Sequence, residues 1–275
     1  MVNLMRRFDA LGKRKVVIGL VHLLPAPGTP YYQDGNFERS LEKAVRDAQA
    51  LEKGGADGCL IQTVDKVFPS DDQADYARVA AVSAITHAVS QVTGLDFQIG
   101  VQFLLNGISA SLAVAKVCGG SFLRCTALIA DGDTDWGVVR ANPAGFFDYR
   151  EKIGAQDIQL IVEVEGMHYH WRGEPRPVGE IAKEVVAKGA AAVEIAHPDE
   201  TTILKLIREI KQVVPGLPVI LGGHTCHENV SRLLAEADGA FVGTCFEDKW
   251  GGSIQEARVR EYVELVRALP NQATT

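Results

Sequence analysis

Short runs of apolar and β-branched residues recur along the chain, and each run is bounded by Gly, Asp or Pro. Runs of this length and composition are typical of buried β-strands. The eight runs are Val16–Leu23, Gly58–Gln62, Phe97–Phe103, Phe122–Ala127, Ile158–Val164, Ala192–Ala196, Pro218–Leu221 and Ala240–Val242.

The segments between these runs have helical spacing and high helix propensity. They are Phe37–Lys53, Asp75–Val92, Ile108–Cys118, Pro143–Ile153, Val178–Lys188, Thr202–Val213, Glu228–Glu236 and Ile254–Ala268. Strict alternation of strands and helices predicts parallel strands. Gly-Gly or Gly-Ala follows several helices, as at Gly54-Gly55 and Gly189-Ala190, and allows a short return to the next strand. Eight such units favour a single closed (β/α)8 TIM barrel with parallel strands over an open doubly wound sheet.

Four loops are longer than the rest: Leu24–Asn36, Gln62–Gln73, Leu128–Asn142 and Met167–Pro177. Each of them follows a predicted strand, and loops that follow strands lie on the face of a barrel that carries active sites. We therefore expect that face to be elaborated after the first, second, fourth and fifth of the eight strands.

The length of 275 residues and the hydrophobic content of 47% are enough for one large core. We expect one barrel domain over residues 1–275, with a short N-terminal extension at residues 1–15. The extension carries five basic residues and is expected to form a short amphipathic helix. No apolar run is long enough to span a membrane, and none follows the basic start as a signal peptide would require.

The net charge of −7, with acidic and basic residues interspersed, argues against nucleic acid or an anionic membrane as the main partner. The five cysteines are odd in number, widely spaced and free of any Cys-x-x-Cys pattern, which favours reduced thiols in the cytoplasm. A homo-oligomer is compatible with the sequence, because a helical pattern does not distinguish a dimer face from a core face.

Polar residues share one parity on the predicted strands three to six. They are Gln98, Gln102, Arg124, Thr126, Glu163, Glu165 and Glu194. Charged groups of this kind are too costly to bury unpaired, so Arg124 is predicted to pair with Glu163 or Glu194 inside the barrel. An ion-pair network that only fills the barrel is one interpretation. The other is that Glu165, nearest the end of its strand, stays unpaired and acts as a general base.

Six of the seven histidines are placed at predicted strand ends or in the loops that follow: His22, His168, His170, His197, His224 and His227. Histidine together with glutamate can serve acid/base chemistry or bind a divalent metal. The candidate metal ligands are His22, Glu163, His168 and His197. No local spacing typical of a zinc site is present, so we favour acid/base and hydrogen-bonding histidines over a tightly bound metal.

Glycines follow the last two predicted strands, at Gly222-Gly223 and Gly243-Thr244. Small residues let backbone N–H groups approach an anion, and a helix starting near Cys226 would add its dipole. We therefore predict a phosphate site formed by Gly222, Gly223, Gly243 and Thr244. Ordinary glycine turns at the ends of two parallel strands are the alternative.

Aromatic and proline residues also fall in the loops that follow strands. Three prolines in His22–Pro30 fix the backbone and suggest a shaped wall behind His22. Trp136, Trp171 and Trp250 are placed where they could stack on a ring, although partly buried loop anchors are a common role for tryptophan.

Several segments resemble the BtpA/SgcQ family. The likeness is most specific in the opening strand and Pro-Gly loop, and it extends over all eight predicted units. The segments that carry it are Ile18–Pro30, Gly100–Asn106, Phe122–Cys125, Thr134–Gly137 and His224–Val230. The resemblance implies a phosphate-binding type of barrel. It also implies a family named for a role in photosystem I accumulation, with other members in operons for sugar-like metabolism.

This chain departs from the family pattern at three loops. It has His224 and His227 where the family has a plain phosphate loop, Met167-His168 where the family tends to have Lys-His, and His197-Pro198 where a Ser-Gly-rich turn is common. These differences suggest a divergent member with histidine-based chemistry.

The sequence leaves three functions open. The first is a cytoplasmic enzyme that acts on a small phosphorylated or anionic metabolite by lyase, aldolase or isomerase chemistry. Its candidate catalytic residues are His22, Arg124, Glu165, His168, His197 and His224. The second is a non-catalytic assembly or stabilisation factor for a membrane complex such as photosystem I. The third is a metal-dependent hydrolase, in which a divalent ion would be the cofactor.

Overall fold

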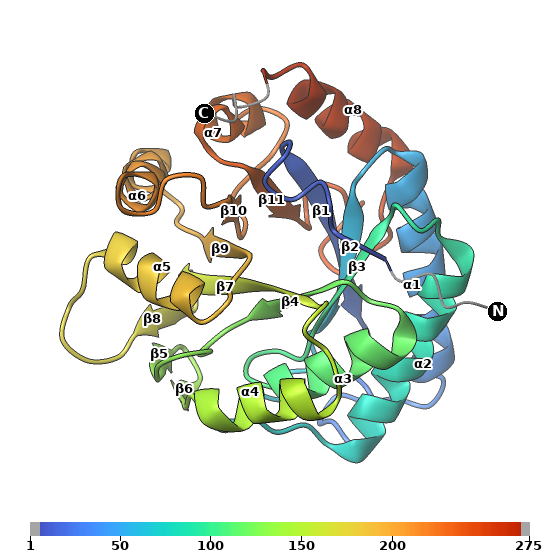
Figure 1. Cartoon of the computed structure of the whole chain (residues 1–275). Coiled ribbons are helices and arrows are strands. Elements are labelled where there is room, and N and C mark those ends of the chain that lie inside the picture. The colour runs from blue at the N-terminus through green and yellow to red at the C-terminus, as the bar shows by residue number, and fades with distance from the viewer. Residues whose placement is uncertain (1–5, 271–275) are drawn as a thin grey trace.

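The computed structural model describes residues 6–270. Eight parallel strands close into a barrel in the order β1-β11-β10-β9-β7-β4-β3-β2, which confirms the predicted fold (Figure 1). The barrel strands are β1 Val16–Leu23, β2 Gly58–Thr63, β3 Gln98–Gln102, β4 Phe122–Cys125, β7 Gln159–Glu165, β9 Ala192–Ile195, β10 Val219–Leu221 and β11 Gly239–Val242. All eight agree with the predicted runs to within a few residues.

Helices surround the barrel in the order of the chain (Figure 1). They are α1 Asn36–Lys53, α2 Tyr76–Val92, α3 Ile108–Cys118, α4 Pro143–Lys152, α5 Val178–Ala187, α6 Glu200–Val213, α7 Val230–Glu236 and α8 Glu256–Arg267. Side-chain caps fix three of the starts. Asp75 accepts from the N–H groups of Ala77 and Arg78, Asn142 accepts from that of Gly145, and Asp199 accepts from that of Thr202.

Apolar side chains fill the lower part of the barrel. Phe8, Phe122 and Phe241 lie in one buried cluster there, with ring centroids 5.3 Å apart for Phe8 and Phe122. A larger buried cluster separates the strands from the surrounding helices. The aromatic floor confines the polar interior residues to the upper half of the barrel, next to the carboxyl ends of the strands.

The expected N-terminal helix is not formed by the described part of the extension, residues 6–15, which consists of turns and irregular backbone. The buried Phe8 closes the base of the barrel, and Gly12 has a φ of +78°, which a right-handed helix cannot accommodate. Arg6 donates to the carbonyl oxygens of Phe97 and Gly119. The segment is thus fixed by its contacts with the barrel; residues 1–5 lie outside the described range.

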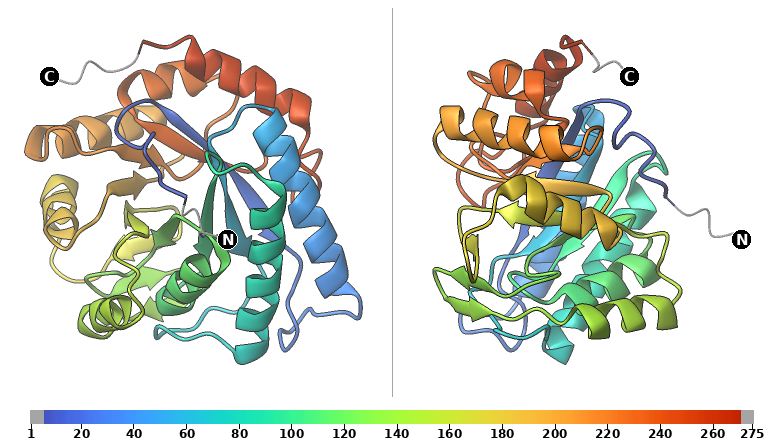
Figure 2. Two further views of the ribbon diagram at one scale, coloured as in Figure 1. Left: turned by 45° about the vertical axis from the view of Figure 1, so that its right-hand side comes forward. Right: turned by 60° about the vertical axis from the view of Figure 1, so that its left-hand side comes forward.

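Two of the long loops form a small antiparallel sheet of their own. Its strands are β5 Gly132–Thr134, β6 Gly137–Val139 and β8 Tyr169–Trp171, in the order β6-β5-β8. The sheet lies at one side of the barrel beside α4 and α5 (Figures 1 and 2). Pairing of β5 with β8 joins the loop that follows β4 to the loop that follows β7.

No helix within residues 6–270 is long and apolar enough to cross a membrane.

Candidate active site

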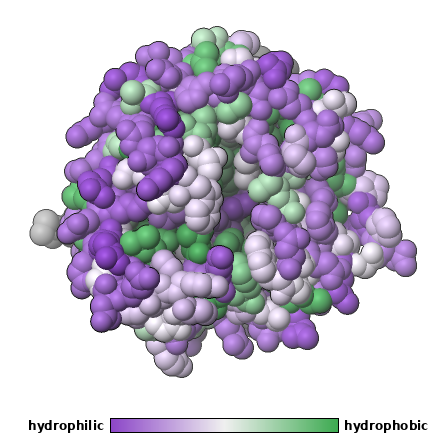
Figure 3. Space-filling view, turned by 180° about the vertical axis from the view of Figure 1, so that it is seen from behind, coloured by the Kyte–Doolittle hydropathy of each residue, from purple (hydrophilic) through white to green (hydrophobic). Residues whose placement is uncertain are grey.

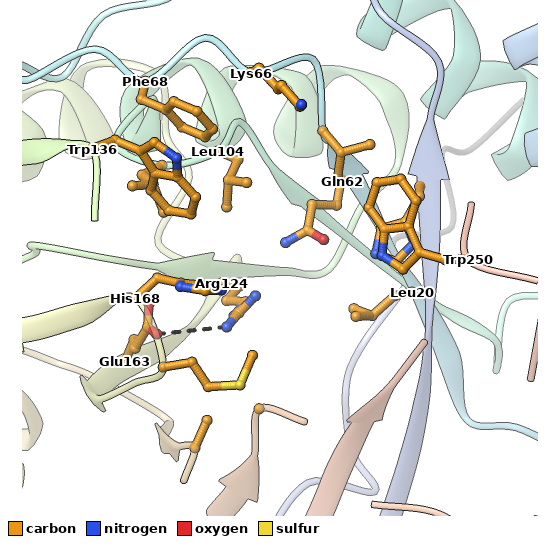
Figure 4. Close-up of a pocket in the computed structure, with 16 residues that line it drawn as sticks. Leu20, Gln62, Lys66, Phe68, Leu104, Arg124, Trp136, Glu163, His168 and Trp250 are labelled. Atoms are coloured by element: carbon orange, nitrogen blue, oxygen red, sulfur yellow. Dashed lines mark ion pairs between the residues drawn. The ribbon is translucent and has the colours of Figure 1, made fainter. Parts of the chain in front are cut away.

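A cavity of about 330 Å³ lies at the carboxyl ends of the barrel strands. It is lined by Leu20, His22, Gln62, Val64, Lys66, Phe68, Leu104, Leu105, Arg124, Trp136, Glu163, Met167, His168, Ala196, Gly222 and Trp250. Seen from behind, the molecule is mainly hydrophilic, with hydrophobic side chains gathered beside the hollowed centre of that face (Figure 3). Figure 4 shows the cavity with polar groups at its floor and aromatic side chains on opposite sides.

An arginine with two carboxylates forms the floor of the cavity. Arg124 donates from Nε and Nη2 to the two carboxylate oxygens of Glu194, both at 2.5 Å, and its Nη2 lies 3.7 Å from Glu163 Oε1. The predicted pairing of Arg124 is therefore confirmed. The guanidinium lies over the ring of Phe241, 5.7 Å from its centroid, so the ion pair rests on the apolar lower core.

The pKa of the fully buried Glu194 is raised to about 7: burial is the main cause, Arg124 opposes it, and the charge of Glu163 adds to it. Burial alone would lower the pKa of Arg124, but Glu194 and Glu163 outweigh it and raise that pKa. Two carboxylates share one guanidinium, so the floor carries no net positive charge. A strongly anionic group is therefore disfavoured at the bottom of the cavity.

Two glycines make room for these carboxylates. A Cβ added at Gly222 would lie 1.9 Å from Glu194 Oε1, and a Cβ added at Gly166 would lie 1.9 Å from Glu163 Oε1. The N–H of Gly222 donates to the carbonyl oxygen of Ile195 at 2.8 Å. Gly222 is thus required by the packing of Glu194, whatever else it contacts.

A histidine and a buried glutamate face each other on the opposite wall. His22 Nδ1 lies 2.9 Å from Glu247 Oε1, and Glu247 Oε2 accepts from the N–H of Gly251 at 2.9 Å. Glu247 is fully buried, and the segment after β11 carries it back to His22. Because Nδ1 faces a carboxylate, the neutral imidazole holds its proton on Nδ1 and presents Nε2 as a base.

Aromatic side chains from separate loops line the sides of the cavity. The rings of Phe68 and Trp136 stack with centroids 4.2 Å apart, and His168 lies 5.0 Å from Trp136. His168 Nδ1 is held by Asp135 at 2.5 Å. Trp250 stacks on His22 with centroids 6.2 Å apart, on the other side of the cavity (Figure 4).

Three of the predicted histidines gather at one part of the rim. Burial lowers the pKa of His224, and the nearby imidazoles His197 and His168 lower it further. His224 Nε2 contacts the sulfur of Met167, which lines the cavity. His168 lines the cavity itself, whereas His197 and His224 lie outside its lining. His197 Nδ1 accepts from the N–H of Asp199 at 3.0 Å.

The prediction that Glu165 points inward and stays unpaired is wrong. A bulge between Glu163 and Glu165 places Glu165 opposite Ile195, whose side chain belongs to the cluster between the barrel and the helices. The bulge reverses the expected parity. Glu165 Oε1 lies 3.1 Å from His170 Nδ1 instead, outside the cavity lining.

The predicted phosphate residues occupy different positions around the rim. Gly222 lines the cavity, and a Cβ at Gly243 would lie 3.3 Å from His22 Cε1. A Cβ at Gly223 would meet open space, and Thr244 is exposed. The helix expected to start near Cys226, or at Glu228, begins only at Val230 and has seven residues. A turn at residues 227–229 separates it from Gly223, and the N–H of Val230 donates to the carbonyl oxygen of Cys226 at 2.9 Å.

The four candidate metal ligands do not converge. Within residues 6–270, no group of three or more His, Cys, Asp and Glu side chains is arranged to hold a metal ion. His22 faces Glu247, Glu163 accepts from Thr126, and His168 faces Asp135.

Sequence reasoning missed several residues that shape the cavity. Glu247 and Lys66 are in loops with no recognised motif, and each is far along the chain from the residue it contacts, His22 or Tyr31. Asp135 lies in Thr134–Gly137, which carries the family resemblance, but that segment does not indicate its contact with His168. Gln62 was counted as the end of a strand, yet its amide donates to Gln102 at 2.5 Å on the floor. The polar parity of the strand predicted at Gly58–Gln62 could have revealed Gln62; no local signal points to the other three.

The protein is a (β/α)8 barrel with a cavity at the carboxyl ends of its strands, the face at which barrels of this kind carry their sites. The chain belongs to the BtpA family, whose model matches residues 13–268. Photosystem I biogenesis protein BtpA of Synechocystis is 27% identical over 97% of this chain and 94% of the relative. The putative sgc region protein SgcQ of Escherichia coli is 26% identical over 94% and 96%. An uncharacterized protein of Thermococcus kodakarensis is 29% identical over 94% and 97%.

Solved structures with the same fold include enzymes. Tryptophan synthase from M. tuberculosis superposes with a TM-score of 0.61 at 18% identity, covering 94% of this chain and 96% of the other. Phosphoribosyl anthranilate isomerase from Thermus thermophilus gives 0.54 at 15% identity, covering 93% and 100%. A structure named native KDPGal gives 0.57 at 14% identity, covering 91% and 94%. At these identities the likeness establishes the fold alone.

Proposed function

We propose that this protein is a cytoplasmic enzyme that moves a proton on a small phosphorylated metabolite, in a reaction of the lyase, aldolase or isomerase type. The observation that carries the proposal is the His22–Glu247 pair, a buried carboxylate behind an imidazole that lines a cavity. The cytoplasm is the proposed compartment because all five cysteines are free thiols.

His22 is proposed as the general base. Glu247 holds the proton on Nδ1 and stabilises the imidazolium that forms when Nε2 accepts a proton from the substrate. The same Nε2 then returns that proton to another substrate atom, so the histidine is regenerated. Abstraction of a proton beside a carbonyl and its return elsewhere is common to isomerases and to many lyases.

The floor is proposed to bind the reacting polar group. Arg124 and Gln62 line the cavity as donors, and Glu163 lies beside them with 7% of its surface exposed. Because Glu194 already neutralises Arg124, this floor suits hydroxyl or carbonyl groups better than a phosphate.

The phosphate is proposed to bind at the rim, near Gly222, Gly223, Gly243 and Thr244, with His168, His197 and His224 close by. His197 and His168 lower the pKa of His224, which supports this position. A bound anion would offset the repulsion between the three imidazoles and favour their protonated forms. The fold of phosphoribosyl anthranilate isomerase, an enzyme whose name describes a phosphorylated compound, is consistent with the proposal but does not identify a substrate.

A thermal-shift screen tests the proposal. Ribose 5-phosphate, AMP, inorganic phosphate and divalent metal salts are added separately to the wild type, to His224→Ala and to a control, His87→Ala, on helix α2. A ligand present at 100 times its Kd adds about 2.7 kcal/mol of stability. We expect a phosphorylated compound to stabilise the wild type and the control more than His224→Ala. Stabilisation by metals alone, or by no compound, would contradict the proposal.

A second candidate is an assembly factor for a membrane complex, which the name of the Synechocystis relative favours. Such a role requires a partner surface and no proton transfer. A His22→Gln variant that keeps partner binding in a pull-down and complements a deletion strain fully would favour this candidate over the enzyme.

A further inference from the structure

A second lobe of about 260 Å³ adjoins the main cavity. It is lined by His22, Leu23, Leu24, Pro25, Tyr31, Val64, Lys66, Trp250 and Gly251. Four of these residues also line the main cavity: His22, Val64, Lys66 and Trp250. The two lobes therefore meet at His22, and a molecule that occupies both passes this histidine.

Lys66 is the cation of the second lobe. Its ammonium lies 5.2 Å from the ring centroid of Tyr31, and among the described residues it forms no ion pair with a carboxylate. The preceding residue is fixed, because Asp65 accepts from Nε and Nη2 of the buried Arg78, both at 2.9 Å. The backbone of Lys66 has a φ of +57°, a conformation uncommon for lysine. The ammonium thus belongs to an anchored segment and carries an uncompensated charge.

The rest of the lobe offers apolar surface and few donors. The N–H of Leu24 already donates to Ser40 Oγ at 2.9 Å, and Pro25 has no N–H to offer. Trp250 is 68% exposed and lines both lobes. A phosphate needs several converging donors, whereas one ammonium above an apolar wall suits a single negative charge.

We propose that this lobe is a subsite for an apolar group that carries one carboxylate, with the carboxylate at Lys66 and the apolar body against Trp250 and Pro25. This subsite rests on the proposed function in one respect, which is that His22, at the junction of the lobes, is the general base. Besides the polar part over Arg124 and Glu163 and the phosphate at the rim, the substrate then carries an apolar acid in the second lobe.

Benzoate is the probe for the subsite, with benzyl alcohol as its neutral counterpart and inorganic phosphate as a different anion. Trp250 fluorescence is followed in a Trp136→Phe, Trp171→Phe protein, where it is the remaining tryptophan. We compare Lys66→Gln and Lys66→Arg with a matched control, Lys205→Gln, on the outer surface of α6. Saturation-transfer NMR of benzoate with the protein that keeps all three tryptophans gives a second readout independent of the two Phe substitutions.

We expect benzoate to bind more tightly than benzyl alcohol. Lys66→Gln is expected to weaken benzoate about tenfold, as for loss of a hydrogen bond to a charged group, while Lys66→Arg and Lys205→Gln retain binding. Equal binding of benzoate to Lys66→Gln, equal binding of benzyl alcohol, or no binding of benzoate by either readout would overturn the subsite. These results are independent of the thermal-shift screen with phosphorylated compounds. If that screen fails while benzoate still binds, the proposed function is rejected and the subsite is retained.

Discussion

Replacing Arg124 with methionine would leave two buried carboxylates without their cation. Glu194 is fully buried and receives two charge-assisted hydrogen bonds from Arg124 at 2.5 Å. Removing one partner of a buried ion pair costs about 3–5 kcal/mol, because the remaining charge stays uncompensated. We expect Arg124→Met to lower the free energy of unfolding by about that amount at pH 8.5.

The loss should depend on pH. The pKa of Glu194 is already raised from 4.5 to about 7 in the folded wild type, and removing Arg124 raises it further. A group whose folded pKa lies above its unfolded pKa binds the proton more tightly when folded, so stability falls as the pH rises through that interval. At pH 5.5 Glu194 is protonated in the folded variant, and the loss should shrink to about 1–3 kcal/mol, the cost of an unpaired buried polar group.

Urea unfolding followed by circular dichroism at pH 5.5 and 8.5 measures both values. The double variant Arg124→Met, Glu194→Gln is the control, because an amide in place of the carboxyl cannot titrate. Its own free energy of unfolding should vary much less with pH than that of the single variant. An equal loss at both pH values, or the same pH dependence in the double variant, would refute the assigned role of Glu194.

Three further predictions concern the same face of the barrel. Gly222→Ala should lower the free energy of unfolding by about 1–3 kcal/mol in urea titrations, because the new Cβ would lie 1.9 Å from Glu194 Oε1; unchanged stability would contradict this packing. Glu247→Gln should slow proton transfer by His22 about 10²-fold or more without unfolding the protein; an unaffected rate would exclude Glu247 as the partner of the base. The pKa of His224, lowered in the free protein, should rise when inorganic phosphate binds, and phosphate should bind more tightly as the pH falls; an unmoved imidazole C–H titration in NMR would place the anion elsewhere.

The fold was predictable because its signals are local. Buried strands appear as short apolar runs, and the glycine stops mark the returns between helices and strands. The pairing of Arg124 also followed from parity along single strands, since a buried arginine requires a carboxylate. These local patterns recur along the chain because the barrel repeats the same strand-helix unit.

The site was less predictable because its geometry depends on bulges and on distant loops. Glu165 changes side at a bulge that the sequence does not mark. Glu247 reaches His22 from 225 positions further along the chain. Gly222 looked like part of a phosphate loop, yet the structure gives it a packing reason, the carboxylate of Glu194. A glycine's motif context therefore does not reveal which neighbour requires it.

Exchange of hydrogen between solvent and a substrate carbon is the direct test of His22 as the general base. The protein is incubated in D2O with a panel of phosphorylated aldoses and ketoses, and deuterium at the carbon beside the carbonyl is measured by NMR or mass spectrometry. We expect incorporation by the wild type, at least about 10²-fold less with His22→Gln, and unchanged incorporation with His87→Ala. Incorporation that persists undiminished in His22→Gln, or none with the wild type for any compound that stabilises it, would show that His22 is not a base that acts on the substrate.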